Sequence, residues 1–426
     1  MQRFTVTERL ALALVPSLAI LIVLFATLVA ERRQEFQRST AIVGFAETTR
    51  ALSGLIHELQ RERGASVGVV ASKRQKPEAI ALLDEQRKRT DQAFKAYRGL
   101  RSASGPTGAE RFEAALRAAD GRLDGLAGQR RGVDGSQAQV GAVVMWYSET
   151  IRGLMHASTE VIKIVDDGRT TLSLVTLQSL MEAKENSGQE RATGNALVSA
   201  GSVEAARYRA FIEALARQND RFAEFAEYAR GSEDALLTRL TEAPTRRTVE
   251  TLRAVLVASL DTGSLDGVTP AQWWAATTAW VDTLKTAEDE LNADIARDSA
   301  GSATAARFHF FAYLGGGGAI VLITALFGIF VARSITGPMG RAARVIDAIN
   351  AGDIAVAPPA ALSPRSEIGR VSNALGVFLA TLADQRRLEA ERRQYEAQMA
   401  ASRRTILISM AQEVERATEK GMAEIV

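Results

Sequence analysis

The sequence predicts an all-α protein that crosses a membrane twice. Alanine, leucine, glutamate and arginine dominate its 426 residues, and alternating strand patterns are hard to find. Two uncharged apolar runs, 10–30 and 310–332, are each long enough to span a bilayer core of about 30 Å at about 1.5 Å per residue. Between them, about 270 residues carry apolar positions at helical spacing, which is enough chain for two antiparallel helix bundles.

The composition excludes several classes of function. The 52 lysines and arginines nearly balance the 50 aspartates and glutamates, so nothing favours a nucleic-acid partner. The basic clusters at 87–89 and 386–387 lie among acidic and amide residues, as on a solvated helix face. Cysteine is absent, and His57, His156 and His309 have no metal-binding or catalytic spacing. We therefore expect a protein that is not an enzyme and that needs no metal or cofactor.

The first apolar run is expected to be an uncleaved membrane anchor behind a short tail, residues 1–9. A cleaved signal peptide is the alternative, but the run exceeds the usual ~7–15 residues of such a segment, and Leu28 and Ala30 form a poor cleavage site. With two spans, both termini lie on one side of the membrane and residues 31–309 on the other. The arginines that flank the spans do not decide which side that is.

The segment between the spans is predicted to contain about seven or eight helices. The first continues from the anchor without a breaker to about Ser72. Turn-forming residues separate the later helices at 101–108, 132–136, 231–234 and 261–270. Thr269 and Pro270 are typical of an N-cap followed by the first helical residue. The helix that they open carries three tryptophans that we expect in the core: Trp273, Trp274 and Trp280.

Beyond the second span the pattern changes to that of a coiled coil. Gly315–Gly318 lie inside the span, where we expect them to allow close helix packing. A short apolar stripe through Val345 and Ile349 ends at 351–353, and a proline-rich linker follows at 357–365. Apolar residues then repeat at alternating steps of three and four, at Ile368, Val371, Leu375, Phe378 and Leu382.

Three arginines lie where apolar residues are expected. Arg63 falls on the buried stripe of the first long helix, four residues after Leu59, whereas Arg61 points elsewhere and reaches solvent. Arg191 falls on the buried stripe of a later helix, and Arg253 is a weaker third case. A buried guanidinium costs several kcal/mol unless it is paired, so each of them needs a partner.

Two interpretations of these arginines remain open. In the first, carboxylates of neighbouring helices, such as Glu62 or Glu190, neutralise them. In the second, Arg63 and Arg191 converge on an anion, because a guanidinium offers a planar fork of donors to a flat oxyanion. Glycines near both arginines would let such a ligand approach the backbone closely.

Three motifs resemble the nitrate- and nitrite-sensing (NIT) domain of bacterial signalling proteins. They are LIHELQRERGASVG (55–68), KENSGQERATGNAL (184–197) and RYRAFIEALARQNDRFAEFA (207–226). The resemblance covers about residues 45–295 and implies two stacked four-helix bundles that bind nitrate or nitrite through motif arginines. Carried onto this chain, the candidate ligand-binding residues are Arg63, Arg191, Arg61, Arg253, Gly64 and Gly188.

A second resemblance covers residues 333–387, directly after the second span. SITGPMGRAARVIDAINAGD (334–353) and SEIGRVSNALGVF (366–378) resemble a HAMP linker, with Pro338 at the family's position. HAMP units are parallel coiled-coil bundles that two chains build in the cytoplasm. The resemblance therefore implies a homodimer in a bacterial cytoplasmic (inner) membrane, with residues 31–309 as a periplasmic sensor domain.

These features together predict a multi-pass transmembrane chemoreceptor for nitrate or nitrite, most similar to a methyl-accepting chemotaxis protein. Residues 388–426 would begin its cytoplasmic signalling coiled coil, which implies a signalling kinase and an adaptor as partners. The sensor half of a histidine kinase is one alternative. A structural membrane coiled-coil protein with internal Arg–Glu pairs is the other.

Overall fold

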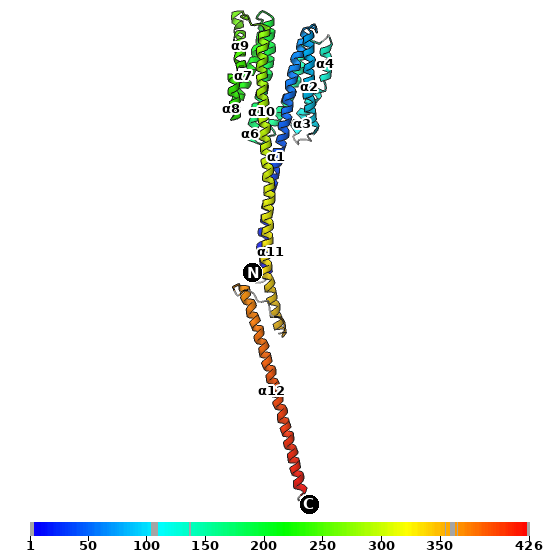
Figure 1. The fold of residues 1–426 in the computed structure, drawn as a ribbon, viewed down its shortest axis with the longest axis vertical. Helices are drawn as coiled ribbons and strands as arrows, with labels where there is room; N and C mark the ends of the chain where they lie inside the picture. The colour runs from blue at the N-terminus through cyan, green and yellow to red at the C-terminus, as the bar shows by residue number, and fades with distance from the viewer. Residues whose placement is uncertain are drawn as a thin grey trace. The chain divides into compact units, whose positions relative to one another are not determined.

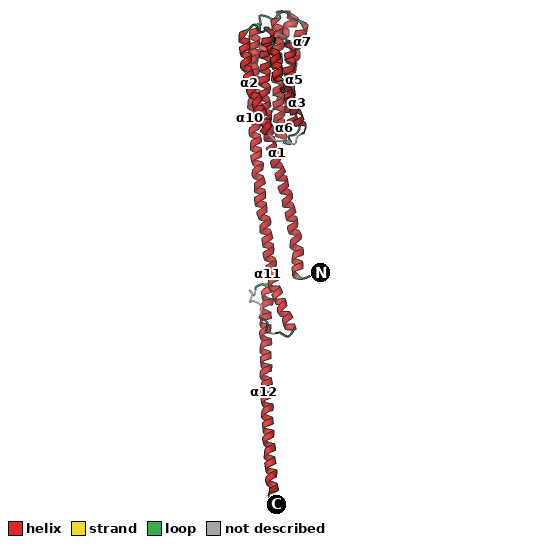
Figure 2. Ribbon diagram, turned by 90° about the vertical axis from the view of Figure 1, so that its right-hand side faces the viewer, coloured by secondary structure: helices red, strands yellow, loops and turns green. Residues whose placement is uncertain are grey.

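The computed structural model describes residues 4–103, 110–135, 138–353, 355–357, 363 and 365–423. Within these residues the chain is helical and contains no β-strand, which confirms the predicted all-α class (Figure 2). Two compact units are present: Val29–Ala312, and a second unit that combines Met1–Leu28 with Tyr313–Val426. The proline-rich linker expected at 357–365 lies mostly outside the described residues.

The described part of the unit Val29–Ala312 is built from α1 and nine further helices. Their bounds are α1 (Val6–Ala71), α2 (Pro77–Ala103), α3 (Glu110–Leu123), α4 (Leu126–Asp134), α5 (Val140–Ile162), α6 (Gly168–Ser199), α7 (Ala205–Tyr228), α8 (Ser232–Glu242), α9 (Pro244–Thr262) and α10 (Pro270–Ala312). Helices α1–α5 form one group and α6–α10 another, and the two groups lie side by side at the same level (Figure 1). In each group one helix position is filled by two consecutive short helices, α3 with α4 and α8 with α9 (Figure 1).

Local signals explain where the central helices begin and end. Asp167 caps α6, because its carboxylate accepts a backbone N–H of the first turn at 2.8 Å. Helix α10 begins at Pro270, and the hydroxyl of Thr269 accepts the N–H of Gln272 at 3.2 Å, as predicted. Helix α9 ends at Thr262 and is capped by Gly263, whose φ of 65° is the left-handed conformation that glycine adopts without strain.

The hydrophobic core runs through both helix groups. One large cluster includes Tyr147 and Trp280, and a smaller one joins α6, α7, α9 and α10 around Trp273. The Trp273 ring packs directly on Gly194, where a Cβ would fall well inside van der Waals distance of the indole. Its Nε1 donates to the carbonyl of Arg191 at 2.9 Å. Gly194 therefore allows α10 to approach α6 closely.

The basic cluster at 87–89 only partly lies on a solvated face. Lys88 and Arg89 are exposed, as predicted. For Arg87 the prediction is wrong, because α4 packs over this part of α2. The Arg87 guanidinium donates to both carboxylate oxygens of Asp134 at 3.0 and 3.1 Å and to the carbonyl of Arg130 at 3.3 Å.

The second unit contains the apolar runs. In the described residues, two helical stretches are long and apolar enough to cross a membrane, Val6–Ala71 and Pro270–Asn350. A π-helical turn, η1 (Tyr313–Gly317), precedes α11 (Gly318–Asn350). A Cβ at Gly317 would lie 2.6 Å from the ring of Phe25, so this glycine allows the close packing that the sequence predicts.

The end of α11 packs beside the last helix, α12 (Glu367–Ala423). Helix α11 continues through Pro338, and α12 runs in the same direction along its final turns (Figure 1). Two residues of the predicted coiled-coil seam, Val371 and Phe378, are 49% and 51% exposed within the single chain. The seam therefore presents apolar side chains that this chain does not cover.

Candidate anion-binding site

Arg63 lies on the buried face of α1, as its spacing predicts, and is 8% exposed. Its guanidinium forms a two-pronged pair with Glu185 of α6, with Nη1 2.7 Å from Oε1 and Nη2 3.1 Å from Oε2. Nη1 also donates to the hydroxyl of Ser148 on α5 at 2.7 Å. Three helices from both groups therefore meet at Arg63.

Glu185 is held by more than this one arginine. The side-chain amides of Gln60 and Gln189 donate to its carboxylate at 2.8 and 2.9 Å. Burial alone raises the pKa of Glu185, but the charge of Arg63 and these hydrogen bonds outweigh burial and hold the pKa below its ordinary value. Glu185 is therefore a fixed negative charge that balances Arg63.

Arg191 has a different environment, about two helical turns after Lys184, the first residue of its motif. Its Nη1 donates to the hydroxyl of Thr278 on α10 at 3.0 Å, and its guanidinium carbon lies 4.5 Å from the centre of the Trp274 ring. The pKa of Arg191 is lowered to about 10, chiefly by burial and secondly by the positive charge of Arg63. It stays charged at neutral pH, yet no carboxylate of the described chain forms an ion pair with it.

The expected core role of the three α10 tryptophans is confirmed for two of them. Trp273 and Trp280 are buried, but Trp274 is 41% exposed. The prediction is wrong for Trp274 because its ring face supports a charged group, the Arg191 guanidinium, rather than the apolar core.

The two motif glycines lie beside the opposite arginine. A Cβ at Gly188 of α6 would lie 3.6 Å from Nη2 of Arg63, and a Cβ at Gly64 of α1 would lie 3.9 Å from Nη2 of Arg191. Each guanidinium tip thus reaches across to the glycine of the other helix. A side chain at either position would occupy the space beside these N–H groups.

The charges that act on Arg191 do not cancel. Besides Arg63, the groups that shift its pKa are Arg61, Asp282 and Glu185. Glu185 is already paired with Arg63 and Asp282 with Arg61, so within the described residues the positive charge of Arg191 is left over. His57 adds no positive charge. Its pKa is lowered to about 2, chiefly by burial and secondly by the charge of Lys184, so its ring is neutral.

The other two candidate arginines each have a carboxylate partner of their own. Arg253 of α9 is paired with Glu190 at 2.6 and 2.7 Å and donates to Gln218 at 3.1 Å, so the ion-pair interpretation describes it. Arg61 is exposed, as predicted, with its Nη1 3.7 Å from Asp282 of α10. The other expected partner, Glu62, binds Arg130 of α4 at 2.8 and 2.9 Å and neutralises neither Arg63 nor Arg191.

A further buried ion pair joins α6 to α10. The Nζ of Lys184 is 2.7 Å from Oε2 of Glu288 on α10, and both side chains have no exposed surface. The hydroxyl of Ser53 donates to the other oxygen of Glu288, and Asn292 donates to Ser53 at 3.2 Å. Burial lowers the pKa of Lys184 in spite of the opposing charge of Glu288.

Sequence reasoning missed four residues of this site: Glu185, Trp274, Thr278 and Asp282. The last three are spaced by four residues on α10, so they share one helix face, and that spacing was a usable signal. Glu185 follows directly after Lys184, which lies on the same helix stripe as Arg191, and nothing in its spacing marks it as the partner of Arg63.

The comparison with known families covers this site. The sequence model of the family described as "Nitrate and nitrite sensing" matches residues 54–296. The chain belongs to this family. The matched range includes the NIT-like motifs around Arg63 and Arg191 and more than half of the chain.

Two known proteins are similar to this NIT chain. The Nitrate regulatory protein of Klebsiella oxytoca is 27% identical over 249 residues, which are 57% of this chain and 60% of that protein. The chain thus spans about three-fifths of the length of this curated relative (60%). The structure of the NasR transcription antiterminator is similar with a TM-score of 0.58 at 18% identity, over 85% of this chain and 99% of that chain, and shows a shared fold.

His57 gives the NIT unit, residues 29–312, a predicted sensitivity to acid. Its pKa is about 2 in the fold against 6.5 ordinarily, so below pH 6.5 the unfolded chain binds a proton that the folded chain does not. The free energy of unfolding therefore has its full value, as far as His57 is concerned, above pH 6.5. Below that pH it falls by about 1.4 kcal/mol for each pH unit, which makes a total loss of about 2 kcal/mol at pH 5. Denaturant unfolding followed by tryptophan fluorescence should show this loss.

The variant His57→Gln should lack this part of the acid loss, because glutamine does not titrate. Equal pH profiles for His57→Gln and the wild type would contradict the prediction.

Proposed function

We propose that this NIT chain is a transmembrane receptor that binds nitrate or nitrite between α1, α6 and α10. The observation that carries the proposal is the unbalanced guanidinium of Arg191 beside Arg63. One excess positive charge matches one monovalent anion, because a buried ion is stable when it is paired. A dianion such as sulfate would reverse the imbalance instead of removing it.

The geometry allows a flat oxyanion to use both arginines. Arg63 can keep its two-pronged pair with Glu185 and still donate its second Nη2–H toward Gly188. Arg191 uses one N–H for Thr278 and keeps its other donors for the anion. Contacts with Thr278 and Trp274 orient the guanidinium before the ligand arrives, which reduces the entropy lost on binding.

Titration of the purified full chain in detergent micelles tests this part of the proposal. All four tryptophans lie between positions 146 and 280, so their fluorescence reports unfolding of the NIT unit. Nitrate or nitrite at a hundred times its dissociation constant should stabilise the unit by about 2.7 kcal/mol, seen as a raised melting temperature. Sulfate at equal ionic strength should give no such shift. Absence of both a melting shift and binding heat for nitrate and nitrite would refute the proposal.

The relay of the signal rests on helix continuity. Helix α1 carries Arg63 and also the first apolar run, and α10 carries Thr278 and leads through η1 into the second run. An anion that shifts α1 against α10 would bias two helices that enter the membrane, and a small shift can select between two packed states. We propose that the HAMP-like segment 333–387 receives this shift in a homodimer and that residues 388–426 pass it to a cytoplasmic kinase and adaptor.

Two features support the dimeric, membrane-bound arrangement. The apolar runs leave large side chains such as Ile22 and Phe327 uncovered, which suits contact with lipid. The exposed seam residues Val371 and Phe378 suit coverage by a second copy. In this proposal the receptor spans the bacterial inner membrane, its NIT unit is periplasmic, and the chain itself catalyses no reaction.

Accessibility of single cysteines tests the topology, because the chain has no native cysteine. In intact cells, a membrane-impermeant thiol reagent should label Lys76→Cys, an exposed position of the NIT unit, and spare Ser402→Cys on α12. Both should react after the cells are permeabilised. Labelling of Ser402→Cys alone in intact cells would reverse the proposed orientation.

A further inference from the structure

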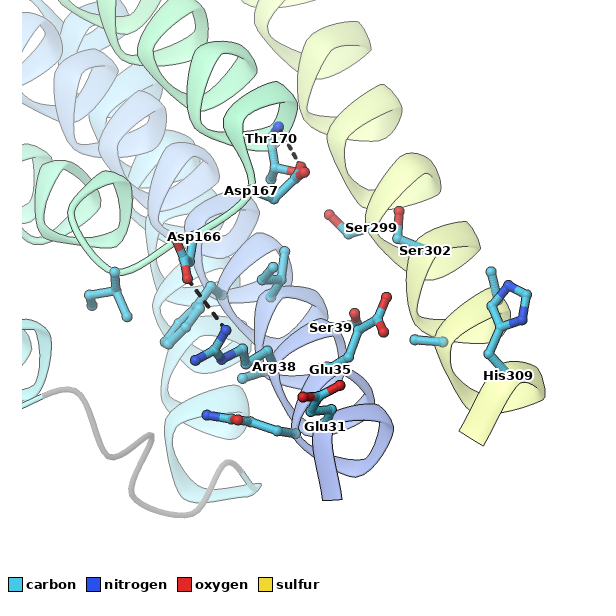
Figure 3. Close-up of a pocket in the computed structure, with 17 residues that line it drawn as sticks. Glu31, Glu35, Arg38, Ser39, Asp166, Asp167, Thr170, Ser299, Ser302 and His309 are labelled. Atoms are coloured by element: carbon cyan, nitrogen blue, oxygen red, sulfur yellow. Dashed lines mark hydrogen bonds and ion pairs between the residues drawn. The ribbon is translucent and has the colours of Figure 1, made fainter. Parts of the chain in front are cut away.

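A cavity of about 920 Å³ lies between α1, the first turn of α6 and α10, away from the anion site (Figure 3). It shares no lining residue with the pair Arg63 and Arg191. Its volume is in the upper part of the range of small-molecule pockets, about 300–1,000 Å³. It is therefore large enough for an organic ligand.

The cavity is strongly acidic. Four carboxylates line it, from Glu31 and Glu35 on α1 and from Asp166 and Asp167 at the start of α6 (Figure 3). The only arginine or lysine among its lining residues is Arg38, whose Nη1 is 3.4 Å from Asp166. Arg32, next to the cavity, also pairs with Glu35 at 2.6 Å, so two of the four negative charges are offset and two remain to attract a cation and repel an anion.

A buried hydroxyl inside the cavity lacks a partner. Ser299 of α10 is 2% exposed, and its Oγ has no hydrogen-bond partner in the described chain. Figure 3 shows this hydroxyl pointing from α10 across the cavity toward the first turn of α6. A buried polar atom is costly unless it is hydrogen-bonded, so a ligand that donates a hydrogen bond to it would be stabilised.

The residues that line the cavity indicate the kind of ligand that it could bind. The described residues contain no cluster of three or more histidine or acidic groups that could hold a metal ion, which favours a larger cation. Ile42, Phe45 and Ala306 add an apolar surface beside the carboxylates. An alkyl ammonium ion has both properties, since it presents N–H donors to the carboxylates and methylene groups to the apolar wall.

We propose that this cavity binds an aliphatic amine, and that a diamine fits it best because the carboxylates lie in two separate places, on α1 and in the loop before α6. The cavity is then a second ligand-binding site of the proposed receptor. Its walls are α1 and α10, the two helices that also carry the anion site and lead into the apolar runs. This proposal does not depend on nitrate binding.

Calorimetric titration of the full chain in detergent micelles with 1,4-diaminobutane tests it. The wild type should bind the diamine saturably. Ser302→Trp, which places a large ring at an exposed lining position, should abolish binding by filling the cavity. The double variant Glu31→Gln/Glu35→Gln should bind about fivefold more weakly, because it removes two half-exposed charge contacts.

Two controls separate this site from general charge effects. Glu47→Gln, which removes an exposed carboxylate of α1 outside the cavity, should bind as the wild type does. Arg191→Ala should also keep diamine binding, whatever its effect on nitrate. The proposal is overturned if the wild type shows no saturable binding, if Ser302→Trp binds equally well, or if magnesium chloride at equal ionic strength reproduces the heat.

Discussion

Replacing Lys184 by methionine is expected to lower the free energy of unfolding of the NIT unit by about 3–5 kcal/mol. The change removes the nearest cation from Glu288, whose side chain has no exposed surface, and leaves only Lys285, with its Nζ 3.7 Å from Oε1. The buried carboxylate then keeps only this longer ion pair, which compensates less of the cost of burying its charge. Denaturant unfolding of the purified full chain, followed by tryptophan fluorescence, measures this loss.

The matched double variant Lys184→Met/Glu288→Met should recover most of the lost stability. Replacing a whole buried ion pair by apolar residues of similar volume is often neutral or stabilising, by about 1–4 kcal/mol. Lys95→Met, which changes an exposed lysine of α2, should have little effect. If the single variant is as stable as Lys95→Met, the pair does not form as the structure shows.

Arg191→Ala is expected to remove the whole nitrate-dependent stabilisation, about 2.7 kcal/mol at a hundred times the wild-type dissociation constant. Arg63→Lys should do the same, since lysine keeps the charge but loses the fork of donors. Melting curves with and without nitrate give both results. Arg89→Ala, at an exposed position of α2, should retain the full shift.

The stability without nitrate separates this result from a purely structural role. Arg191 has no carboxylate partner in the described chain, so Arg191→Ala should cost little in the absence of anion. Arg253→Ala should instead be clearly destabilising, because it leaves the buried Glu190 unpaired. A large loss of basal stability in Arg191→Ala, with no nitrate shift in the wild type, would favour internal pairing.

Properties that depend on one helix were predicted from the sequence. The periodicity of α1 placed Arg63 on the buried face and Arg61 in solvent, and local chemistry placed the start of α10 at Pro270. These features need no knowledge of the neighbouring helices. The same is true of the two apolar runs, whose length and composition are local.

Properties that depend on which helices face each other were not predicted. Of the two partners offered, Glu190 does pair with one of the arginines, Arg253, but Glu62 pairs with none of the three. Arg63 pairs with Glu185 instead, since α1 meets that face of α6. Trp274 was expected in the core because tryptophan is large and apolar, and only the approach of Arg191 makes its ring a support for a cation. One sequence does not show which side chains a fold brings together.

The contact of Trp273 with Gly194 has a consequence for how this sequence can change over time. A methyl group at position 194 is incompatible with the indole, whereas a smaller residue at position 273 would first make room for it. The order of substitution therefore matters: alanine at 194 is tolerated only after the tryptophan has gone. The two positions should accordingly vary as a linked pair among descendants of this chain, with 273 changing first.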